Sequence, residues 1–144
     1  MPHVTLLYPF RPRNEFPALQ SLLARACASV PAFSLRLAEF RCFCHGSGRC
    51  TLWLAPEPKQ AIIHLQSVLA QVVPDCNDVA GIAGGFMPHL SVGQAANMTE
   101  AEQLCRALQT RWQPLSFAVR EVCLIWRNEP PDDVFRIACR LPLG

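Results

Sequence analysis

The chain carries Pro-His-Val-Thr-Leu at residues 2–6 and a second version, Pro-His-Leu-Ser-Val, at residues 88–92. Each stretch places a hydroxyl side chain two residues after a histidine, and side chains two apart on a strand point to the same face. A third His-x-Ser, at residues 45–47, lies in a glycine-rich turn and lacks the flanking proline and apolar residues. The longer form therefore marks two copies of one motif, which indicates an internal duplication.

The segments that follow each motif repeat the same order of elements. In the first half, we expect a strand at residues 4–8 and a helix at residues 16–30. A strand at residues 33–44, with a phase shift at Glu39, is followed by a turn at residues 45–48 and a strand at residues 51–55. In the second half, a helix opened by a Thr99-x-x-Glu102 capping box precedes strands at residues 115–122 and 135–141. Residues 115–122 align without gaps on residues 33–40, so the order strand, helix, strand, strand is present twice.

This pattern predicts an α+β fold, a single domain of two similar halves at about residues 1–74 and 86–144. A helix over residues 62–72 and a loop over residues 75–85 complete the first half. Antiparallel sheets are expected to line a central groove around a pseudo-twofold axis. The duplication then places His3 and His89 opposite each other across the groove, joined by Thr5 and Ser91.

Composition excludes several classes of protein. With 144 residues, 51% hydrophobic and 17% charged, the chain fits one compact domain and is too apolar for disorder. A net charge of +2 is too small to announce a nucleic-acid binder by itself. No apolar run approaches the ~20 residues of a membrane span, and no secretory signal precedes the first motif, so a cytoplasmic location is expected. The eight cysteines are expected to be reduced thiols.

Two such motifs in duplicated halves resemble the 2H phosphoesterase superfamily, the group of 2′-5′ RNA ligase-like and cyclic phosphodiesterase-like proteins. Pro-His-Val-Thr-Leu-Leu-Tyr-Pro-Phe at residues 2–10 looks like the first motif of one branch, and Phe-Met-Pro-His-Leu-Ser-Val-Gly at residues 86–93 looks like the second. The resemblance covers nearly the whole chain. It implies metal-independent attack on a phosphodiester or cyclic phosphate, with His3 and His89 as acid and base and with Thr5 and Ser91 holding phosphate oxygens.

Elementary chemistry supports the same interpretation. Opening a 2′,3′-cyclic phosphate requires a proton taken from the attacking water and a proton given to the leaving oxygen, and two imidazoles perform both transfers near neutral pH. No metal or other cofactor is needed, and no carboxylate cluster lies beside the motifs. The expected substrates are RNA ends, 2′-5′ oligonucleotides or nucleotide cyclic phosphates, cleaved or reversibly formed; the sequence identifies no protein partner and no membrane association.

Further substrate contacts are expected among Tyr8, Phe10, Arg11 and Arg127, although core packing is the favoured role of the two aromatic residues. Some RNA ligase-like relatives place an arginine shortly after the second motif, where this chain has Gly93 and Gln94. Arg11, Arg13 and Arg127 are the candidates to supply that charge. Relatives also have a strand before the first motif, whereas this chain begins at Met1, so an open sheet edge is expected.

Two other functions remain open from the sequence. A catalytically weak module that binds RNA or protein would keep the groove without turnover. A zinc-stapled interaction domain would use the sulfur and imidazole groups of the predicted turn, namely Cys42, Cys44, His45 and Cys50, although Cys-x-Cys is tighter than the usual zinc spacing. His64, which has no matching partner in the other half, is expected to be structural.

Overall fold

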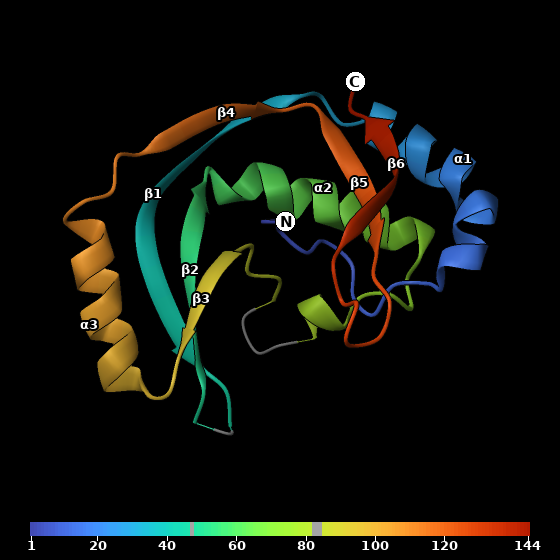
Figure 1. The fold of residues 1–144 in the computed structure, drawn as a ribbon. Helices are drawn as coiled ribbons and strands as arrows, with labels where there is room; N and C mark the ends of the chain where they lie inside the picture. The colour runs from blue at the N-terminus through green and yellow to red at the C-terminus, as the bar shows by residue number, and fades with distance from the viewer. Residues whose placement is uncertain (47, 82–84) are drawn as a thin grey trace.

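Helices and strands follow one another in the order that the sequence predicts, with two exceptions: residues 4–8 form no strand, and the strand predicted at residues 115–122 is divided into two (Figure 1). The computed structural model describes residues 1–46, 48–81 and 85–144. The described elements are η1 (Arg13–Glu15), α1 (Phe16–Ala28), β1 (Phe33–Cys44), β2 (Cys50–Glu57), α2 (Lys59–Val72), η2 (Asp78–Ala80), β3 (Leu90–Ala95), α3 (Met98–Gln109), β4 (Leu115–Val119), β5 (Glu121–Trp126) and β6 (Arg136–Pro142). The fold is therefore α+β, as predicted.

The main sheet is built from strands of both halves. Its order is β3-β2-β1-β4, and each neighbouring pair is antiparallel. Strands β1 and β2 come from the first half of the sequence, whereas β3 and β4 come from the second. Beyond Arg120 the chain leaves this sheet, and β5 pairs with β6 in a separate antiparallel hairpin. The sheet curls around the N-terminal segment, which runs between it and the β5–β6 hairpin (Figure 1).

The phase shift expected at Glu39 is confirmed as an irregularity in strand pairing. The register of β1 against β2 slips between Leu37 and Glu39, as a β-bulge does. The matching shift beside Glu121 has a different result, because there the strand breaks at Arg120 into β4 and β5. The same local signal therefore bends one strand and divides its counterpart between two sheets.

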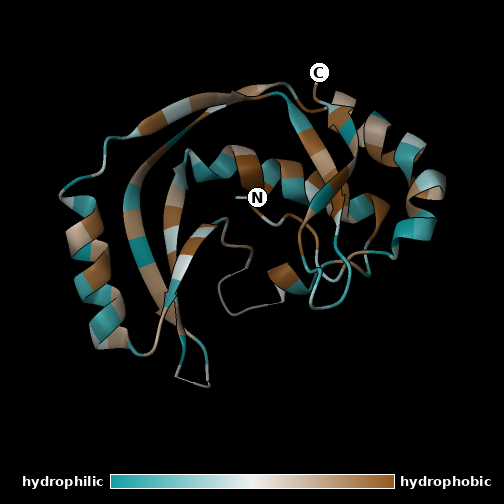
Figure 2. Cartoon of the chain, in the orientation of Figure 1, coloured by the Kyte–Doolittle hydropathy of each residue, from teal (hydrophilic) through white to brown (hydrophobic). Residues whose placement is uncertain are grey.

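Each half contributes a helix that covers the strands of the other half. Helix α3 packs on β1 and β2, and α1 packs on β5 and β6. Hydrophobic and hydrophilic residues alternate along the strands, so that each strand has an apolar face to bury (Figure 2). The larger core joins α1, α2 and the β5–β6 hairpin through buried residues Phe16, Leu23, Cys27, Val30, Leu65, Leu69, Leu124 and Leu141. A smaller core lies under α3 and contains Cys50, Leu52, Ala95, Ala101 and Cys105.

The start of α3 differs from the predicted capping box. The Asn97 side chain accepts a hydrogen bond from the Glu100 backbone N–H at 3.0 Å, and the Ala96 N–H donates to the Glu100 carboxylate at 2.7 Å. The helix therefore begins before Thr99, with Asn97 and Glu100 in the roles predicted for Thr99 and Glu102. Asparagine is the stronger N-cap residue, which explains the earlier start.

The predicted strand at residues 4–8 is wrong. The segment makes only two isolated bridges, from Val4 to Leu90 and from Tyr8 to Asn77. Tyr8 exchanges backbone hydrogen bonds with Cys76 and Asp78, so the chain leaves the edge of the sheet soon after Val4. Residues between the two bridges bury apolar side chains against the larger core and do not continue a ladder.

The expectation of eight reduced thiols is also wrong. Cys44 and Cys50 form a disulfide that closes the β1–β2 hairpin, and the other six cysteines are free. The two residues are directly opposite in the register, with their Cα atoms 3.9 Å apart. The hairpin predicted around residues 45–48 is confirmed, and its register brings these sulfur atoms together.

None of the helices in residues 1–46, 48–81 and 85–144 combines the length and the apolar character needed to cross a membrane.

Candidate functional site

One backbone bridge brings the two sequence motifs side by side. Val4 pairs with Leu90 in antiparallel fashion, so His3 lies opposite Ser91 and Thr5 lies opposite His89. Residues next to the bridge on both segments project to the same side, away from Val4 and Leu90. Diagonal neighbours in such a pair have Cα atoms ~7–8 Å apart, a span that long side chains close. From this register we expect the two imidazoles and the two hydroxyls to lie near one another on one face.

The two histidines are held by the same contact. His3 Nδ1 lies 3.0 Å from the Met1 carbonyl oxygen, and His89 Nδ1 lies 2.9 Å from the Met87 carbonyl oxygen. A carbonyl oxygen only accepts, so each Nδ1 must carry a hydrogen and donate it. In a neutral ring, Nε2 is then the free acceptor. Both rings are half-buried. Because Nδ1 is occupied in each of them, Nε2 is the nitrogen that each ring presents for proton transfer.

Aromatic rings from the sheet surround His89. Its ring meets Phe43 edge-on, with ring centroids 5.5 Å apart, and meets Trp53 at 5.9 Å. Trp53 is only 4% exposed, and its Nε1 has no hydrogen-bond partner among the described residues. Phe43 also contacts His45, whose Nε2 lies 3.1 Å from the Thr51 hydroxyl. These contacts fix the orientation of the His89 ring from the side of β1 and β2.

His3 is supported from the loop between β5 and β6. Its ring lies edge-on to Phe135, with centroids 4.8 Å apart, and the Arg127 guanidinium lies 4.9 Å from the centre of the same Phe135 ring. Arg127 and Phe135 flank the loop between β5 and β6. This loop is tied together by Asp132, which accepts hydrogen bonds from Arg136 at 2.8 and 3.0 Å and from Asn128 at 2.7 Å.

The charge on Asp132 favours this arrangement. The hydrogen bonds from Arg136, followed by the one from Asn128, lower the pKa of the Asp132 carboxyl below its ordinary value. The carboxylate therefore stays ionised at neutral pH and keeps its donors. The loop that carries Arg127 and Phe135 is thus held beside His3.

The residues predicted as further substrate contacts lie in different environments. The Arg11 side chain forms an ion pair with Asp75, and Arg13 lies over the Trp126 ring at 4.0 Å. Phe10 packs against Phe16 in the larger core, at 5.4 Å between ring centroids, which confirms the favoured core role for Phe10. Tyr8 is 62% exposed, which contradicts the favoured core role for that residue. Of the three candidate arginines, Arg127 is linked to a motif histidine, because it contacts Phe135 and Phe135 contacts His3. The contacts of Arg11 and Arg13 given above are with Asp75 and Trp126.

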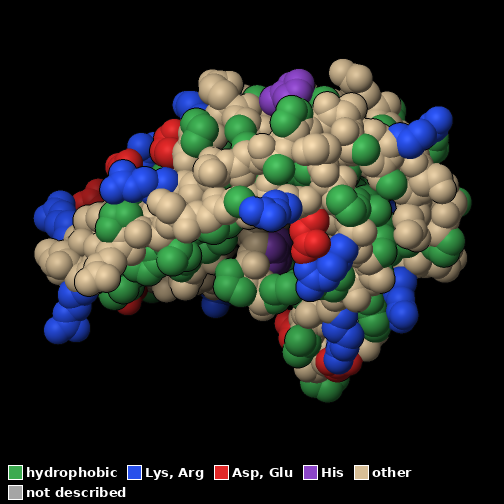
Figure 3. All heavy atoms as spheres, turned by 90° about the horizontal axis from the view of Figure 1, so that it is seen from above, with side chains coloured by type: hydrophobic (Ala, Val, Ile, Leu, Met, Phe, Trp, Pro, Cys, Tyr) green, Lys and Arg blue, Asp and Glu red, His purple; other side chains and the backbone are tan. Residues whose placement is uncertain are grey.

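The surface beside the motifs is hollowed. Seen from above, a hollow between two lobes has a histidine side chain at its bottom and Lys or Arg side chains at its rim (Figure 3). A cavity of about 370 Å³ is lined by His3 and Thr5 together with apolar residues such as Leu65 and Phe117. A second, more open cavity of about 880 Å³ is lined by Ser91. Within the described part of the chain, neither cavity is lined by both histidines, so these apolar spaces adjoin the paired motifs and do not enclose them.

The zinc-stapled alternative does not fit the structure. Cys44 and Cys50 are joined in a disulfide and cannot both act as thiolate ligands, and His45 is bonded to Thr51. Among residues 1–46, 48–81 and 85–144, no three His, Cys, Asp or Glu side chains gather as a metal site. His64 is exposed on α2 and not on a buried helix face.

Sequence patterns identified the motif residues but missed two that support them. Phe43 lies on the phase of β1 opposite to Phe40 and Cys42, so it is a large apolar residue on the side expected to be polar. An apolar residue on the face expected to be polar is the signal by which the sequence could have indicated Phe43. Phe135 was assigned to a strand because of its apolar alternation, whereas it lies just before β6 and faces His3.

Comparison with known proteins supports the family and the fold. The sequence profile described as "2'-5' RNA ligase superfamily" matches residues 1–131. No match is found among curated proteins. The structure is similar to the crystal structure of TT0787 of Thermus thermophilus, with 21% sequence identity and a TM-score of 0.68. That similarity covers 99% of this chain and 78% of TT0787, and at this identity it bears on the fold. The paired motifs and the profile agree, and the chain belongs to the 2′-5′ RNA ligase superfamily, the 2H phosphoesterase group.

Proposed function

We propose that the protein is a metal-independent phosphoesterase that hydrolyses, or reversibly forms, cyclic phosphate or 2′-5′ phosphodiester bonds at RNA ends, in oligonucleotides or in nucleotides. The observation that carries the proposal is the matched pair of Nδ1 contacts in His3 and His89. They leave two equivalent Nε2 atoms, one on each motif, for proton transfer. Membership in the superfamily supports phosphoester chemistry on RNA-like substrates.

In the proposed reaction, one histidine is neutral and the other is protonated. The neutral Nε2 takes a proton from water as its oxygen attacks phosphorus, and the imidazolium gives its proton to the ribose oxygen as the P–O bond breaks. The Thr5 and Ser91 hydroxyls donate hydrogen bonds to the non-bridging oxygens, where negative charge develops. The two imidazoles exchange their protonation states in one turnover, and the reverse sequence forms the bond.

The direct test is turnover of a panel of 2′,3′-cyclic nucleotides and 2′-5′-linked dinucleotides, with the products identified by mass spectrometry and by chromatography. We expect hydrolysis of at least one cyclic substrate to a single 2′- or 3′-monophosphate, because an acid held on one side of the phosphate would protonate one of the two ribose oxygens. Binding of these ligands without any turnover would favour the alternative, a weak RNA- or protein-binding module.

The pH profile and the response to a chelator form one prediction. Because one imidazole must be neutral and the other protonated, kcat/KM is expected to follow a bell-shaped curve whose limbs belong to the coupled pair. Activity measured after dialysis against EDTA should equal that of the untreated protein. The proposal would be contradicted if the rate rose through the alkaline range without a maximum and if activity lost in EDTA returned only on adding a divalent ion. Those results would indicate that a metal-bound hydroxide, and not a histidine, is the group that acts.

A second prediction concerns Arg127. Its guanidinium lies on the Phe135 ring beside His3, where it can attract an anionic substrate. Arg127→Ala is expected to raise KM by ~3–10-fold with little change in kcat, since an exposed charge contributes modestly to binding. Arg13→Ala is the matched control, because Arg13 also stacks on an aromatic ring but lies on Trp126. Equal effects of the two substitutions would assign Arg127 to general surface charge.

A further inference from the structure

An arginine lies beyond one of the aromatic rings that contact His89. The Arg41 guanidinium is 5.8 Å from the centre of the Trp53 ring, which itself lies 5.9 Å from the centre of the His89 ring. Strand pairing puts these groups in line, because Arg41 on β1 is opposite Trp53 on β2, and Trp53 is opposite Ser91 on β3. Side chains directly opposite each other in neighbouring strands lie on the same face of a sheet. Arg41 therefore lies on the face that carries the second motif, two strands away from Ser91.

The other motif histidine has the same succession of groups. Phe135 contacts the His3 ring at 4.8 Å, and the Arg127 guanidinium lies 4.9 Å from the centre of the Phe135 ring. The supporting hairpin comes each time from the half of the chain that does not contain the histidine, β1–β2 for His89 and β5–β6 for His3. The two hairpins lie on opposite sides of the N-terminal segment (Figure 1). One guanidinium therefore flanks the histidine pair on each side.

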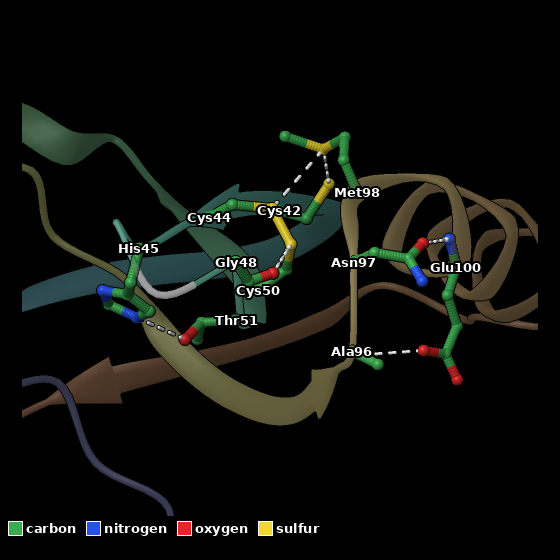
Figure 4. The surroundings of a disulfide bond; sticks show 10 residues. All are labelled: Cys42, Cys44, His45, Gly48, Cys50, Thr51, Ala96, Asn97, Met98 and Glu100. Atoms are coloured by element: carbon green, nitrogen blue, oxygen red, sulfur yellow. Dashed lines mark hydrogen bonds between the residues drawn. A yellow bond between two sulfur atoms is a disulfide. The ribbon is translucent and has the colours of Figure 1, made fainter.

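Both hairpins are held together near their tips. In the β1–β2 hairpin, the disulfide between Cys44 and Cys50 joins the strands, and His45 Nε2 lies 3.1 Å from the Thr51 hydroxyl (Figure 4). In the β5–β6 hairpin, the Asp132 carboxylate ties the loop together through the hydrogen bonds described above. Groups that are carried on rigid elements lose less conformational entropy when they bind a ligand. The two arginines are therefore mounted on braced supports.

We propose that Arg41 and Arg127 each bind a phosphate next to the scissile one, so that the favoured substrate is an oligonucleotide with a charged linkage on both sides of the reacting bond. This inference rests on the proposed function, because it takes the paired histidines as the place of reaction. Guanidinium groups form paired, charge-assisted hydrogen bonds with phosphate oxygens. In the contacts of the described residues, each guanidinium is linked to a motif histidine through an aromatic ring and not directly. That placement suits a neighbouring phosphate and leaves the reacting phosphate to the motif residues.

Arg41 has a carboxylate partner that a phosphate must displace. Its guanidinium lies 2.7 Å from the Glu39 carboxylate, and this hydrogen bond lowers the pKa of the Glu39 carboxyl, which stays ionised at neutral pH. Glu57 adds further negative charge near Arg41. The Arg41 and Glu39 side chains are 49% and 57% exposed, and exposed ion pairs contribute little free energy. A phosphate that accepts two N–H groups can therefore replace Glu39, and removing the Glu39 charge should strengthen phosphate binding.

The test uses four 2′-5′-linked tetranucleotides that share the same central phosphodiester. Their two outer linkages are phosphodiesters or uncharged methylphosphonates, in all four combinations, and chromatography counts cleavage at the central linkage alone. In the wild type, each charged outer linkage is expected to lower KM by ~3–10-fold with little change in kcat. Arg41→Gln should abolish the effect of one outer linkage, and Arg127→Gln should abolish the effect of the other. Glu39→Gln should enlarge the effect that Arg41→Gln abolishes.

Arg106→Gln is the matched control. Arg106 is also an exposed arginine paired with a carboxylate, at 3.5 Å from Glu102, but it lies on α3, which packs on the side of β1 that carries Phe40 and Cys42. All the substituted side chains are exposed, so the variants should keep the fold, which circular dichroism checks.

The proposal is overturned if the outer charges leave the wild-type KM unchanged, if Arg41→Gln acts no more strongly than Arg106→Gln, or if both arginine variants act on the same outer linkage. Any of these results alongside cleavage of the central bond would leave the proposed activity intact. If the wild type cleaves none of the four molecules, the proposed activity fails on them. Fluorescence anisotropy of the same four molecules, labelled, then applies the same criteria to Kd in place of KM.

Discussion

Replacing His3 or His89 with alanine is expected to lower kcat/KM for a 2′,3′-cyclic nucleotide by ~10²-fold or more, the usual effect of removing a general acid or base. Each ring supplies a free Nε2 that alanine cannot replace. The double variant should lose little beyond the slower single variant, since the two groups act as a unit. Steady-state kinetics with purified variants measures the effect.

His64→Ala is the control for this experiment, because His64 is an exposed histidine on α2. It should retain full activity, and all the variants should share the wild-type melting temperature to within a few degrees. Full activity in either motif variant would remove that histidine from the mechanism and leave the other without its partner.

Leu23→Ala is expected to destabilise the protein by about 2–5 kcal/mol. Leu23 is 1% exposed in the larger core, where α1 meets α2 and the β5–β6 hairpin, so its removal leaves a cavity among residues that cannot all collapse into it. In a chain of this length each kcal/mol corresponds to roughly 4 °C in Tm. Chemical denaturation and calorimetry measure the loss.

The neighbouring residue provides a matched control. Leu22 is in the same helix and is 44% exposed, so Leu22→Ala should change stability by no more than ~0.5 kcal/mol. Equal losses in the two variants would show that helix formation in α1, and not burial against the hairpin, determines the effect.

Periodicity predicted the parts of the fold that local sequence controls. The phase shift in the alternation at Glu39 predicted the irregularity that the structure has between Leu37 and Glu39. The apolar spacing of residues 62–72 predicted most of α2. Long-range pairing was less accessible. The hairpin around residues 45–48 was predicted, but the sequence does not give the register that places Cys44 directly opposite Cys50. The sequence of residues 4–8 likewise does not show that Val4 pairs with Leu90 while the rest of the segment leaves the sheet.

The candidate site divides in the same way. His3, Thr5, His89 and Ser91 were identifiable because a duplicated motif is visible without coordinates. The residues that support the histidines were not identifiable, because Phe43 contacts His89 from β1 and Phe135 contacts His3 from the loop before β6. Arg11, Arg13 and Arg127 were equivalent as sequence letters, and only the ion pair with Asp75 and the two ring contacts separate them.

The main sheet contains strands from both halves of the chain, so neither half has a complete sheet of its own. Strand β3 completes the sheet beside β2, and β4 completes it beside β1, while α1 and α3 each cover strands of the opposite half. Without the second half, β1 and β2 would each lose one neighbour; without the first half, β3 and β4 would have no partner strand, and either half alone would hold one histidine of the pair. Because the main sheet and both motif histidines need strands and segments of both halves, we expect the two halves to fold and to act only together.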